Sequence, residues 1–444
     1  MSEKQIQKSK GMLVALFSMA IAALTIWGCG TDGYNNPNDS ITTTKTATAL
    51  IEPQTLKQWI DEGKINGKGL DRVVIIDLSS AAQYNGGHIP GAVYLDSGTE
   101  IYKTRLEGIA PAAGMVPDGA TMDAYIKRMG IDQNTTIVFT TNSASNIIWA
   151  TRGYFTFRYW GFPKERLKVL NGYNKAWDAT YPGTLTAAVP TVTPSNYSVR
   201  NNVALASNLR ASLGEMISTV KAGLATNVII DTRGSDGLVG VGTKYSYDGD
   251  AGTTPGVFLN TVGVTDYVAF EGRMKGAKAV GYSTLLDSAN NNKFLPADQL
   301  ATKFTAIGMD STKTAYVYCR TGVIASSEFF VLDGILGWNV LDYDGSWSQW
   351  GAMSGDVAKD GVLDSYSGWR TDTAALSEVI TYNKDNALTV ERIILDPLSV
   401  QLYSNTADLT ANQIEKEDAA YMEGGTAGGA PTSAPAASGG GGGC

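Results

Sequence analysis

The stretch Thr314–Leu332, TAYVYCRTGVIASSEFFVL, combines a strand-like apolar run with a short loop and the beginning of a helix. The run ends at Cys319, and the loop that follows contains one glycine, Gly322. The chain has three cysteines, and the other two, Cys29 and Cys444, lie outside the predicted folded body. Cys319 is therefore predicted to be a free thiol where a strand leads into a helix, a place suited to an activated nucleophile.

The same strand–loop–helix order occurs twice in the 444 residues. One helix-like segment leads to the strand RVVIIDLSS, which contains Asp77, and another leads to NVIIDTRGS, which contains Asp231. β-branched strands that alternate with helices indicate parallel sheets covered on both faces. We expect an α/β protein of two tandem domains, residues 50–190 and 191–355, each a parallel sheet flanked by helices. The insert at 234–270, rich in Gly, Thr, Asp and Tyr, predicts surface loops.

The segments outside these domains have a different composition. Residues 1–28 join early lysines to an apolar run, which is typical of a signal peptide. Residues 29–49 form a predicted lipid-anchored linker that starts at Cys29. Residues 356–423 form a C-terminal extension, in which ALTVERIILDPLSVQLY predicts a strand and TANQIEKEDAAYM predicts a helix. Residues 424–444 are a tail of Gly, Ala and Ser that is expected to be disordered.

Charge and residue counts narrow the classes of partner and chemistry. The formal net charge is −8 and no basic cluster is present, so nucleic acid is excluded as a partner. The only histidine is His88, which excludes a histidine-based triad or a multi-histidine metal site, and no cofactor is expected. Lipid on Cys29 would attach the chain to the cell envelope, and Gly30 in the next position favours the outer membrane.

Three motifs on this doubled pattern resemble the tandem-domain rhodanese family, the thiosulfate and mercaptopyruvate sulfurtransferases. They are GHIPGA (Gly87 to Ala92), CRTGVIAS (Cys319 to Ser326) and YDGSWSQW (Tyr343 to Trp350), and the likeness covers about residues 50–352. The resemblance implies a catalytic second domain and an inactive first domain. In the first domain the sequence FTTNSASN stands where the cysteine loop would be, with Thr140 or Thr141 in place of the thiol.

The resemblance implies that Cys319 is the catalytic residue and carries sulfur as a persulfide. The substrate would be a small sulfur compound, bound by the loop residues Arg320, Thr321, Gly322, Val323 and Ile324. A thiol reacts as the thiolate, and the pKa of a free cysteine is about 8.5. We expect the loop N–H groups and the helix start to lower the pKa of Cys319, and Arg320 to attract an anionic donor.

Two positions depart from the thiosulfate enzymes. Those enzymes have a lysine two residues after the cysteine, where this chain has Thr321. They also have a second arginine four residues after the arginine of an Asp-x-Arg motif; here Arg233 matches the first arginine and Gly237 replaces the second. Arg233 is expected to pair with an acid or carbonyl at the domain interface or to contact substrate. The uncharged Thr321 is closer to the mercaptopyruvate branch, although Arg320 is not typical of it.

Other interpretations remain open at the level of sequence. A cysteine phosphatase of a related fold needs an arginine six residues after the cysteine, and that residue is Ala325. Cys319 could instead be an inert buried thiol, in a non-catalytic lipoprotein that serves as a binding or assembly subunit of a cell-envelope complex. Structural roles are predicted for the remaining notable residues: His88, Asp77, Asp231, Trp347 and Trp350.

Overall fold

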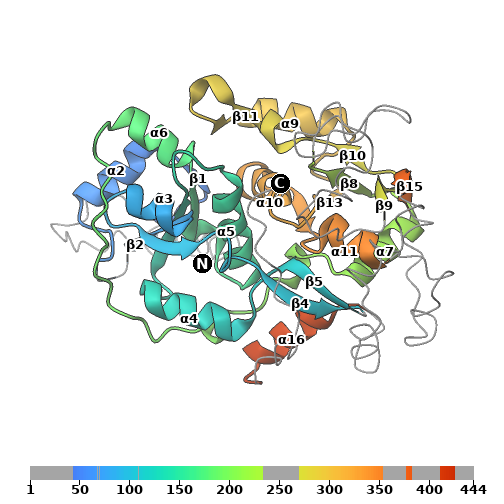
Figure 1. Cartoon of the computed structure of the whole chain (residues 1–444), viewed down its shortest axis with the longest axis horizontal. Helices are drawn as coiled ribbons and strands as arrows, with labels where there is room; N and C mark the ends of the chain where they lie inside the picture. The colour runs from blue at the N-terminus through green and yellow to red at the C-terminus, as the bar shows by residue number, and fades with distance from the viewer. Residues whose placement is uncertain are drawn as a thin grey trace, which may run out of the picture. The chain divides into compact units, whose positions relative to one another are not determined.

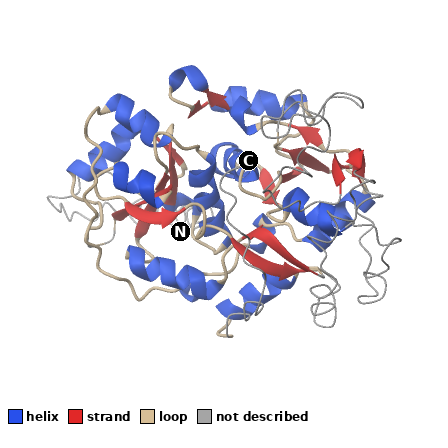
Figure 2. Ribbon diagram, viewed as in Figure 1, coloured by secondary structure: helices blue, strands red, loops and turns tan. Residues whose placement is uncertain are grey.

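A computed structural model describes residues 44–67, 69, 71–108, 110–233, 270–353, 377–382 and 411–425 (Figure 1). The predicted signal peptide, Cys29, Gly237, the strand predicted at 387–403 and the tail from residue 426 lie outside the described residues, as does the insert except Phe270. The described body contains two parallel sheets with helices packed against them (Figure 2).

The first sheet has the order β1-β7-β6-β2-β3, and all neighbouring strands are parallel. Side chains of a strand alternate between the two faces of a sheet. In β2, Val73 and Ile75 pack with residues of α2 and α6, whereas Val74 and Ile76 pack with residues of α4 and α5. Helices therefore cover both faces, as predicted. The bounds are β1 (Leu50–Ile51), α2 (Pro53–Asp61), β2 (Arg72–Ser79), α3 (Ala81–Gly86), β3 (Val93–Asp96), α4 (Gly119–Met129), β6 (Thr135–Thr140), α5 (Ile148–Tyr159), β7 (Leu167–Leu170) and α6 (Tyr173–Thr180).

The second sheet repeats this order as β10-β8-β13-β14, again with parallel neighbours. A single bridge between Arg210 and Asp342 stands where β1 pairs with β7 in the first sheet. The doubled α/β architecture predicted from the sequence is therefore confirmed. The bounds are α7 (Leu213–Ala222), β8 (Asn227–Asp231), β10 (Lys278–Ala279), α9 (Ala297–Ala306), β13 (Thr314–Tyr318), α10 (Ala325–Phe329), a π-helix (Phe330–Leu336), β14 (Asn339–Asp342) and α11 (Ser346–Met353).

In the part of the chain that the structure describes, three antiparallel pairs of strands accompany the two sheets. The β4–β5 hairpin belongs to the first domain, and its second strand contacts α11 of the second. A second pair joins β9 to β15, which lies in the C-terminal extension and was not predicted from the sequence. The bounds are β4 (Lys103–Glu107), β5 (Ala110–Met115), β9 (Phe270–Met274), β15 (Ser377–Tyr382), β11 (Leu286–Asp287) and β12 (Lys293–Phe294). Short 3₁₀ turns occur at Lys164–Arg166, Val199–Asn201, Ser207–Leu209, Tyr282–Leu285 and Ser288–Asn290.

The end of the predicted linker is part of the folded body. Thr44 is buried, its N–H and hydroxyl bond the carboxylate of Asp71, and Ala49 is buried beside β1. The ammonium of Lys168 donates hydrogen bonds to the carbonyls of Thr46 and Thr48 at 2.8 and 2.6 Å. Residues 44–49 were predicted as linker, and this boundary was wrong because their backbone carbonyls and small side chains pack against the first domain.

The helix predicted near the C-terminus is confirmed as α16 (Gln413–Met422), which lies beside β4 (Figure 1). Its Asp418 accepts two hydrogen bonds of 2.8 Å from Arg105 of β4 and one of 2.8 Å from the hydroxyl of Tyr159. Bidentate contacts of this kind are among the stronger polar contacts in proteins. Helix α16 of the C-terminal extension is therefore bound to the first domain.

The two domains meet through α5 and α10. The ring of Phe329 packs edge-on against Phe155 at a centroid distance of 4.9 Å, and Phe330 packs in the same way against Tyr154 at 4.9 Å. These rings belong to one hydrophobic core that includes residues of both sheets. Because such close-packed contacts fix neighbouring helices, α5 of the first domain forms a firm support for the segment that follows Cys319.

Candidate active site

Cys319 follows the last residue of β13 and begins the loop 319–324, which leads into α10. Its side chain is completely buried. The Cys319 N–H donates to the hydroxyl of Ser346 at 3.1 Å, and the Cys319 carbonyl accepts from the N–H of Trp347 at 3.1 Å. Both partners lie at the start of α11, so strand and helix together fix the backbone at the thiol.

Backbone N–H groups of the loop surround the sulfur of Cys319. The N–H of Gly322 donates to Sγ at 3.1 Å, and the N–H groups of Thr321, Ile324 and Ala325 also make contacts that favour the thiolate. Such a ring of donors stabilises a negative charge at its centre. The loop can therefore hold an anionic sulfur, either a thiolate or the terminal atom of a persulfide.

The expected acidity of Cys319 was wrong. Burial raises the pKa of the Cys319 thiol above its ordinary value, and the N–H groups of Ala325, Thr321 and Ile324 only partly offset this effect. Removing a charged sulfur from water disfavours the thiolate more than these donors favour it. The resting site therefore holds a neutral thiol at neutral pH.

Gly322 allows the loop to close against the segment before α11. Its φ is +77°, and a Cβ at this position would lie 2.4 Å from the carbonyl oxygen and 2.5 Å from the Cα of Asp344. Backbone atoms cannot move aside as a flexible side chain can, and a side chain at this φ is itself disfavoured. The close approach of two backbone segments beside Cys319 thus requires glycine.

We predict that Gly322→Ala displaces the loop and lowers the rate at which Cys319 takes up sulfur by about tenfold or more, because the N–H groups no longer converge on Sγ. Sulfur uptake is measured by mass spectrometry after exposure to polysulfide. The matched control is Gly337→Ala, since Gly337 also has a positive φ, +70°, but a Cβ there meets nothing within 4 Å. Equal uptake by both variants would contradict the role assigned to Gly322.

The other predicted loop residues form the wall around the thiol. Arg320, Val323 and Ile324 are buried, and Thr321 is half-buried. Arg233 pairs with Asp231, two residues earlier, at 2.5 Å between Nη2 and Oδ2, and its guanidinium lies 5.0 Å from the ring centroid of Trp347. Arg233 therefore pairs with an acid and lies against the residue whose N–H holds the Cys319 carbonyl.

The first domain has a threonine where the second has the thiol. In the register of the two sheets, Thr140 pairs with Asp77 and Tyr318 pairs with Asp231. The residue after each of these strands is Thr141 in one domain and Cys319 in the other. Of the two threonines considered from the sequence, Thr141 thus corresponds to Cys319. Its hydroxyl donates to the carbonyl of Leu78 at 2.7 Å.

Comparison with known families agrees with this doubled geometry. The sequence model of the rhodanese-like domain matches residues 52–180 and 215–353, which together make up more than half of the chain. The chain belongs to the rhodanese-like family. It carries two copies of the domain in tandem, and Cys319 lies in the second.

Curated relatives of this rhodanese-like protein are identical to it at about a quarter of the aligned residues. It is 25% identical over 315 residues to the sulfur carrier protein TtuD of Thermus thermophilus, covering 69% of this chain and 94% of that protein. It is 28% identical over 298 residues to the thiosulfate sulfurtransferase of Corynebacterium glutamicum, covering 66% and 86%. The first is named as a sulfur carrier and the second as a sulfurtransferase.

A solved structure with a related fold is the anaerobic ergothioneine biosynthesis enzyme from Chlorobium limicola. Its TM-score is 0.50 at 17% identity, with 68% of each chain covered. At this identity the likeness concerns the fold alone. Within the described residues of the rhodanese-like chain, no helix has the length and apolar character needed to cross a membrane.

Two buried acids border the cysteine loop and were not singled out from the sequence. Asp342 ends β14, and Glu328 lies on α10 directly after the loop. Within the described residues, no carboxylate oxygen of either side chain has a hydrogen-bond partner. Burial holds the pKa of both carboxyls well above their usual range, because it disfavours the charged form. The Asp342 carboxyl also adds to the rise in the pKa of Cys319, so it opposes an anion at Sγ.

The residues that were predicted to have structural roles lie in packed or hydrogen-bonded positions. His88 stacks on Tyr84 at a centroid distance of 3.8 Å, and its Nδ1 lies 2.9 Å from the Tyr84 carbonyl oxygen. Asp77 accepts a hydrogen bond of 2.8 Å from Asn174. Trp347 and Trp350 are completely buried in the second domain. These positions are consistent with packing rather than chemistry.

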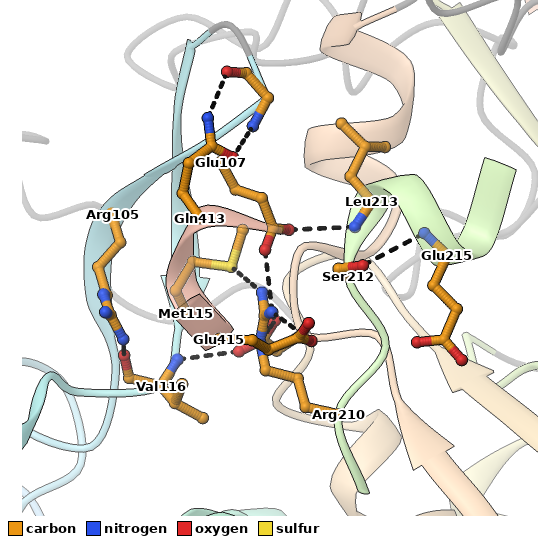
Figure 3. Close-up of polar contacts among 12 residues, drawn as sticks. Arg105, Glu107, Met115, Val116, Arg210, Ser212, Leu213, Glu215, Gln413 and Glu415 are labelled. Carbon is orange, nitrogen blue, oxygen red and sulfur yellow. Dashed lines mark hydrogen bonds and ion pairs between the residues drawn. The ribbon is translucent and has the colours of Figure 1, made fainter. Parts of the chain in front are cut away.

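A buried ionic cluster supports the site from the side of the β4–β5 hairpin and α16 (Figure 3). The guanidinium of Arg210 contacts Glu107 at 2.9 Å, Asp344 at 2.9 Å and Glu415 of α16 at 3.1 Å. Glu107 also accepts from the N–H of Leu213 at 3.1 Å. Three carboxylates thus share one guanidinium, and the excess of negative charge favours retention of a proton by one of them.

We predict that this excess charge makes the protein less stable as pH rises. Burial raises the pKa of Glu415 from 4.5 to about 8, with Glu107, Glu215 and Asp344 adding to the effect against Arg210. Between these two pH values the folded chain holds a proton that the unfolded chain lacks. The contribution is therefore full below 4.5 and is lost as pH rises through about 8.

The measurement is urea unfolding of wild type and Glu415→Gln at about pH 5 and about pH 8, with the free energy of unfolding compared. The loss of stability between the two pH values should be smaller in Glu415→Gln than in wild type. Glu423→Gln is the control, because Glu423 ends the same helix with an exposed side chain. An unchanged difference in Glu415→Gln would show that Glu415 holds no extra proton.

Proposed function

We propose that the chain is a sulfurtransferase that moves sulfane sulfur from a small donor to a thiophilic acceptor through a persulfide on Cys319. The observation that carries the proposal is the ring of loop N–H groups around the buried Sγ, with Gly322 N–H at 3.1 Å. A ring of this kind has a clear use if the sulfur becomes an anion during the reaction. The names of the curated relatives support the same chemistry.

The reaction runs in two displacement steps. The thiolate of Cys319 attacks the transferable sulfur of the donor, a Cys319 S–S bond forms, and the rest of the donor leaves with the electron pair of its broken bond to that sulfur. With thiosulfate the leaving group is sulfite. An acceptor such as cyanide then attacks the outer sulfur, forms thiocyanate, and returns the Cys319 thiolate. Electrons balance without an external oxidant or reductant.

The loop favours sulfur donors whose binding requires few positively charged side chains. Thr321 is uncharged where the thiosulfate enzymes carry a lysine, so we propose mercaptopyruvate or polysulfide ahead of thiosulfate as the donor. Arg320 supplies a cation within the loop. The test is a comparison of the three donors with cyanide as the acceptor, followed as thiocyanate formed by the purified protein.

The pH profile of that assay follows from the burial of the thiol. Burial raises the pKa of Cys319, so the thiolate fraction, and with it the rate of loading, should still be rising above about pH 8.5, the value of a free thiol. Transfer from none of the three donors at any pH would contradict the proposal. A rate that levels off near neutral pH would contradict the raised pKa.

The complete burial of Cys319 and its raised pKa favour a second candidate, a non-catalytic binding or assembly subunit of a cell-envelope complex. The two candidates differ in what a cell needs from the thiol. If the chain is such a subunit, cells with Cys319→Ser should behave as wild type while cells without the gene do not. If the chain is an enzyme, cells with Cys319→Ser and cells without the gene should show the same defect.

We also propose that Cys29 carries lipid and anchors the chain to the outer membrane. The support is the sequence pattern of residues 1–30, in which lysines and an apolar run precede Cys29 and Gly30. Mass spectrometry of the mature N-terminus from the membrane fraction tests it. A soluble product cleaved at another residue would contradict it.

A further inference from the structure

We propose that the first domain completes the Cys319 site, with Arg152 of α5 as a positioning residue that holds the cysteine loop in shape. The inference rests on the proposed sulfur transfer, since it assigns Arg152 a role in that reaction. The resemblance described from the sequence treated the first domain as an inactive partner. The contacts of Arg152 give this domain a part in the chemistry.

Arg152 is completely buried and joins the two domains at the loop. Its Nη1 donates to the carbonyl of Gly322 at 3.0 Å, and its Nη2 donates to the carbonyl of Gly114 in β5 at 2.6 Å. Because the guanidinium is planar with donors in a fixed fork, these bonds set the position of Gly322 relative to β5. A lysine has one donor head and cannot reproduce both contacts in the same geometry.

Both backbone polar groups of Gly322, the N–H and the carbonyl, therefore have a hydrogen-bond partner. Its N–H points to Sγ at 3.1 Å, and its carbonyl is bound to Arg152 at 3.0 Å. The carbonyl and N–H of one peptide unit lie in one plane and point in opposite directions. Fixing the Gly322 carbonyl thus also fixes the N–H of the next residue, Val323, and limits rotation of the loop away from the sulfur.

The β4–β5 hairpin of the first domain packs against the same loop. A Cβ on Gly114 would lie 2.3 Å from the carbonyl oxygen of Thr321 and 3.2 Å from that of Asp344, so the backbone of β5 is in direct contact with both segments. Asp344 in turn accepts from the N–H of Val116 at 2.9 Å, just beyond β5. Arg152 is thus one part of a continuous contact between the first domain and the loop.

The buried guanidinium of Arg152 is only partly paired, which indicates a role other than stabilising the fold. Nη2 of Arg152 lies 3.9 Å from Oδ2 of Asp344, and that carboxylate also accepts a hydrogen bond of 2.9 Å from Arg210. Within the described residues, Nε of Arg152 has no hydrogen-bond partner. A buried charge satisfied mainly by carbonyls is costly for stability. One of those carbonyls belongs to Gly322, so the buried guanidinium is held at the cysteine loop itself.

The experiment compares Arg152→Gln and Arg152→Lys with Arg158→Gln as the matched control. Arg158 lies on the same helix and also reaches the second domain, where its Nε contacts Asp333 at 3.0 Å, away from the cysteine loop. Two readouts are taken. One is the rate of sulfur loading from polysulfide, by mass spectrometry. The other is the pH at which the ¹³Cβ signal of Cys319 titrates in cysteine-labelled protein, assigned by its loss in Cys319→Ser.

In Arg152→Gln, we expect loading to slow by about tenfold or more, because small misplacements of a reacting group are costly. The titration midpoint of Cys319 should rise by about one unit as donors to the thiolate are lost. Arg152→Lys should fall between Arg152→Gln and wild type. Arg158→Gln should match wild type in both readouts, whatever it does to thermal stability.

The proposal is overturned if Arg152→Gln and Arg158→Gln behave alike in loading and in titration. If wild type takes up no sulfur, the proposed function fails, but the titration still decides whether Arg152 controls the thiol. If Arg152→Gln does not fold, Arg152→Lys decides alone: wild-type loading with a wild-type midpoint overturns the proposal, and slower loading with a raised midpoint supports it.

Discussion

Cys319→Ser is expected to abolish sulfur transfer and to leave the fold intact. Serine is nearly isosteric, and its hydroxyl can accept the N–H of Gly322 that Sγ accepts at 3.1 Å. It cannot form a persulfide, so residual transfer should be below about a hundredth of wild type, since covalent catalysis depends on the one nucleophile. The measurement is thiocyanate formation from the best donor, with circular dichroism and thermal unfolding to verify the fold.

The matched control is Thr141→Ser, at the corresponding position of the first domain. It should transfer sulfur at the wild-type rate, because Thr141 donates to the carbonyl of Leu78 and a serine hydroxyl can do the same. Transfer by Cys319→Ser above about a hundredth of wild type would mean that another group carries the sulfur. The single-thiol mechanism would then be wrong.

The second large effect is expected on stability, from Arg210→Met. Removing the guanidinium leaves Glu107 and Asp344 buried without the partner that each contacts at 2.9 Å. Loss of one member of a buried ion cluster typically costs about 3–5 kcal/mol in the free energy of unfolding. Urea unfolding at neutral pH measures the loss. The cluster also joins α16 to both domains, so we expect limited proteolysis to cleave the extension faster in Arg210→Met than in wild type.

Arg128→Met is the control for this loss. Arg128 pairs with Glu100 at 2.6 Å, but its side chain is 44% exposed, so water screens the pair. Exposed pairs contribute about 1 kcal/mol or less. If Arg210→Met and Arg128→Met lower the free energy of unfolding equally, the buried cluster stabilises the protein no more than an exposed ion pair does.

The sequence predicted the elements that depend on local pattern. The apolar β-branched runs that end at Asp77 and Asp231 became β2 and β8 of two parallel sheets. The helix predicted from TANQIEKEDAAYM became α16. Such elements follow from the periodicity of a few neighbouring residues, which is why they can be read before any tertiary contact is known.

The sequence did not predict what covers the loop. The pKa of Cys319 was expected to fall, because loop N–H groups are local and visible in the motif. Its rise comes from burial, and segments distant in the sequence pack on the loop: Asp344 lies against Gly322, and Gly114 of β5 lies against Thr321. Arg152 reaches Gly322 from 170 residues away along the chain, and no local signal marks it. Long-range contacts of this kind decided the properties of the thiol.

The most direct test of the account is to locate the sulfur. The purified chain is exposed to polysulfide, mercaptopyruvate or thiosulfate, then digested, and the peptide containing Cys319 is weighed by mass spectrometry. The account predicts one added sulfur on Cys319, which cyanide removes. An unmodified Cys319 after all three donors, or added sulfur that cyanide leaves in place, would contradict the claim that this thiol carries sulfur between two substrates.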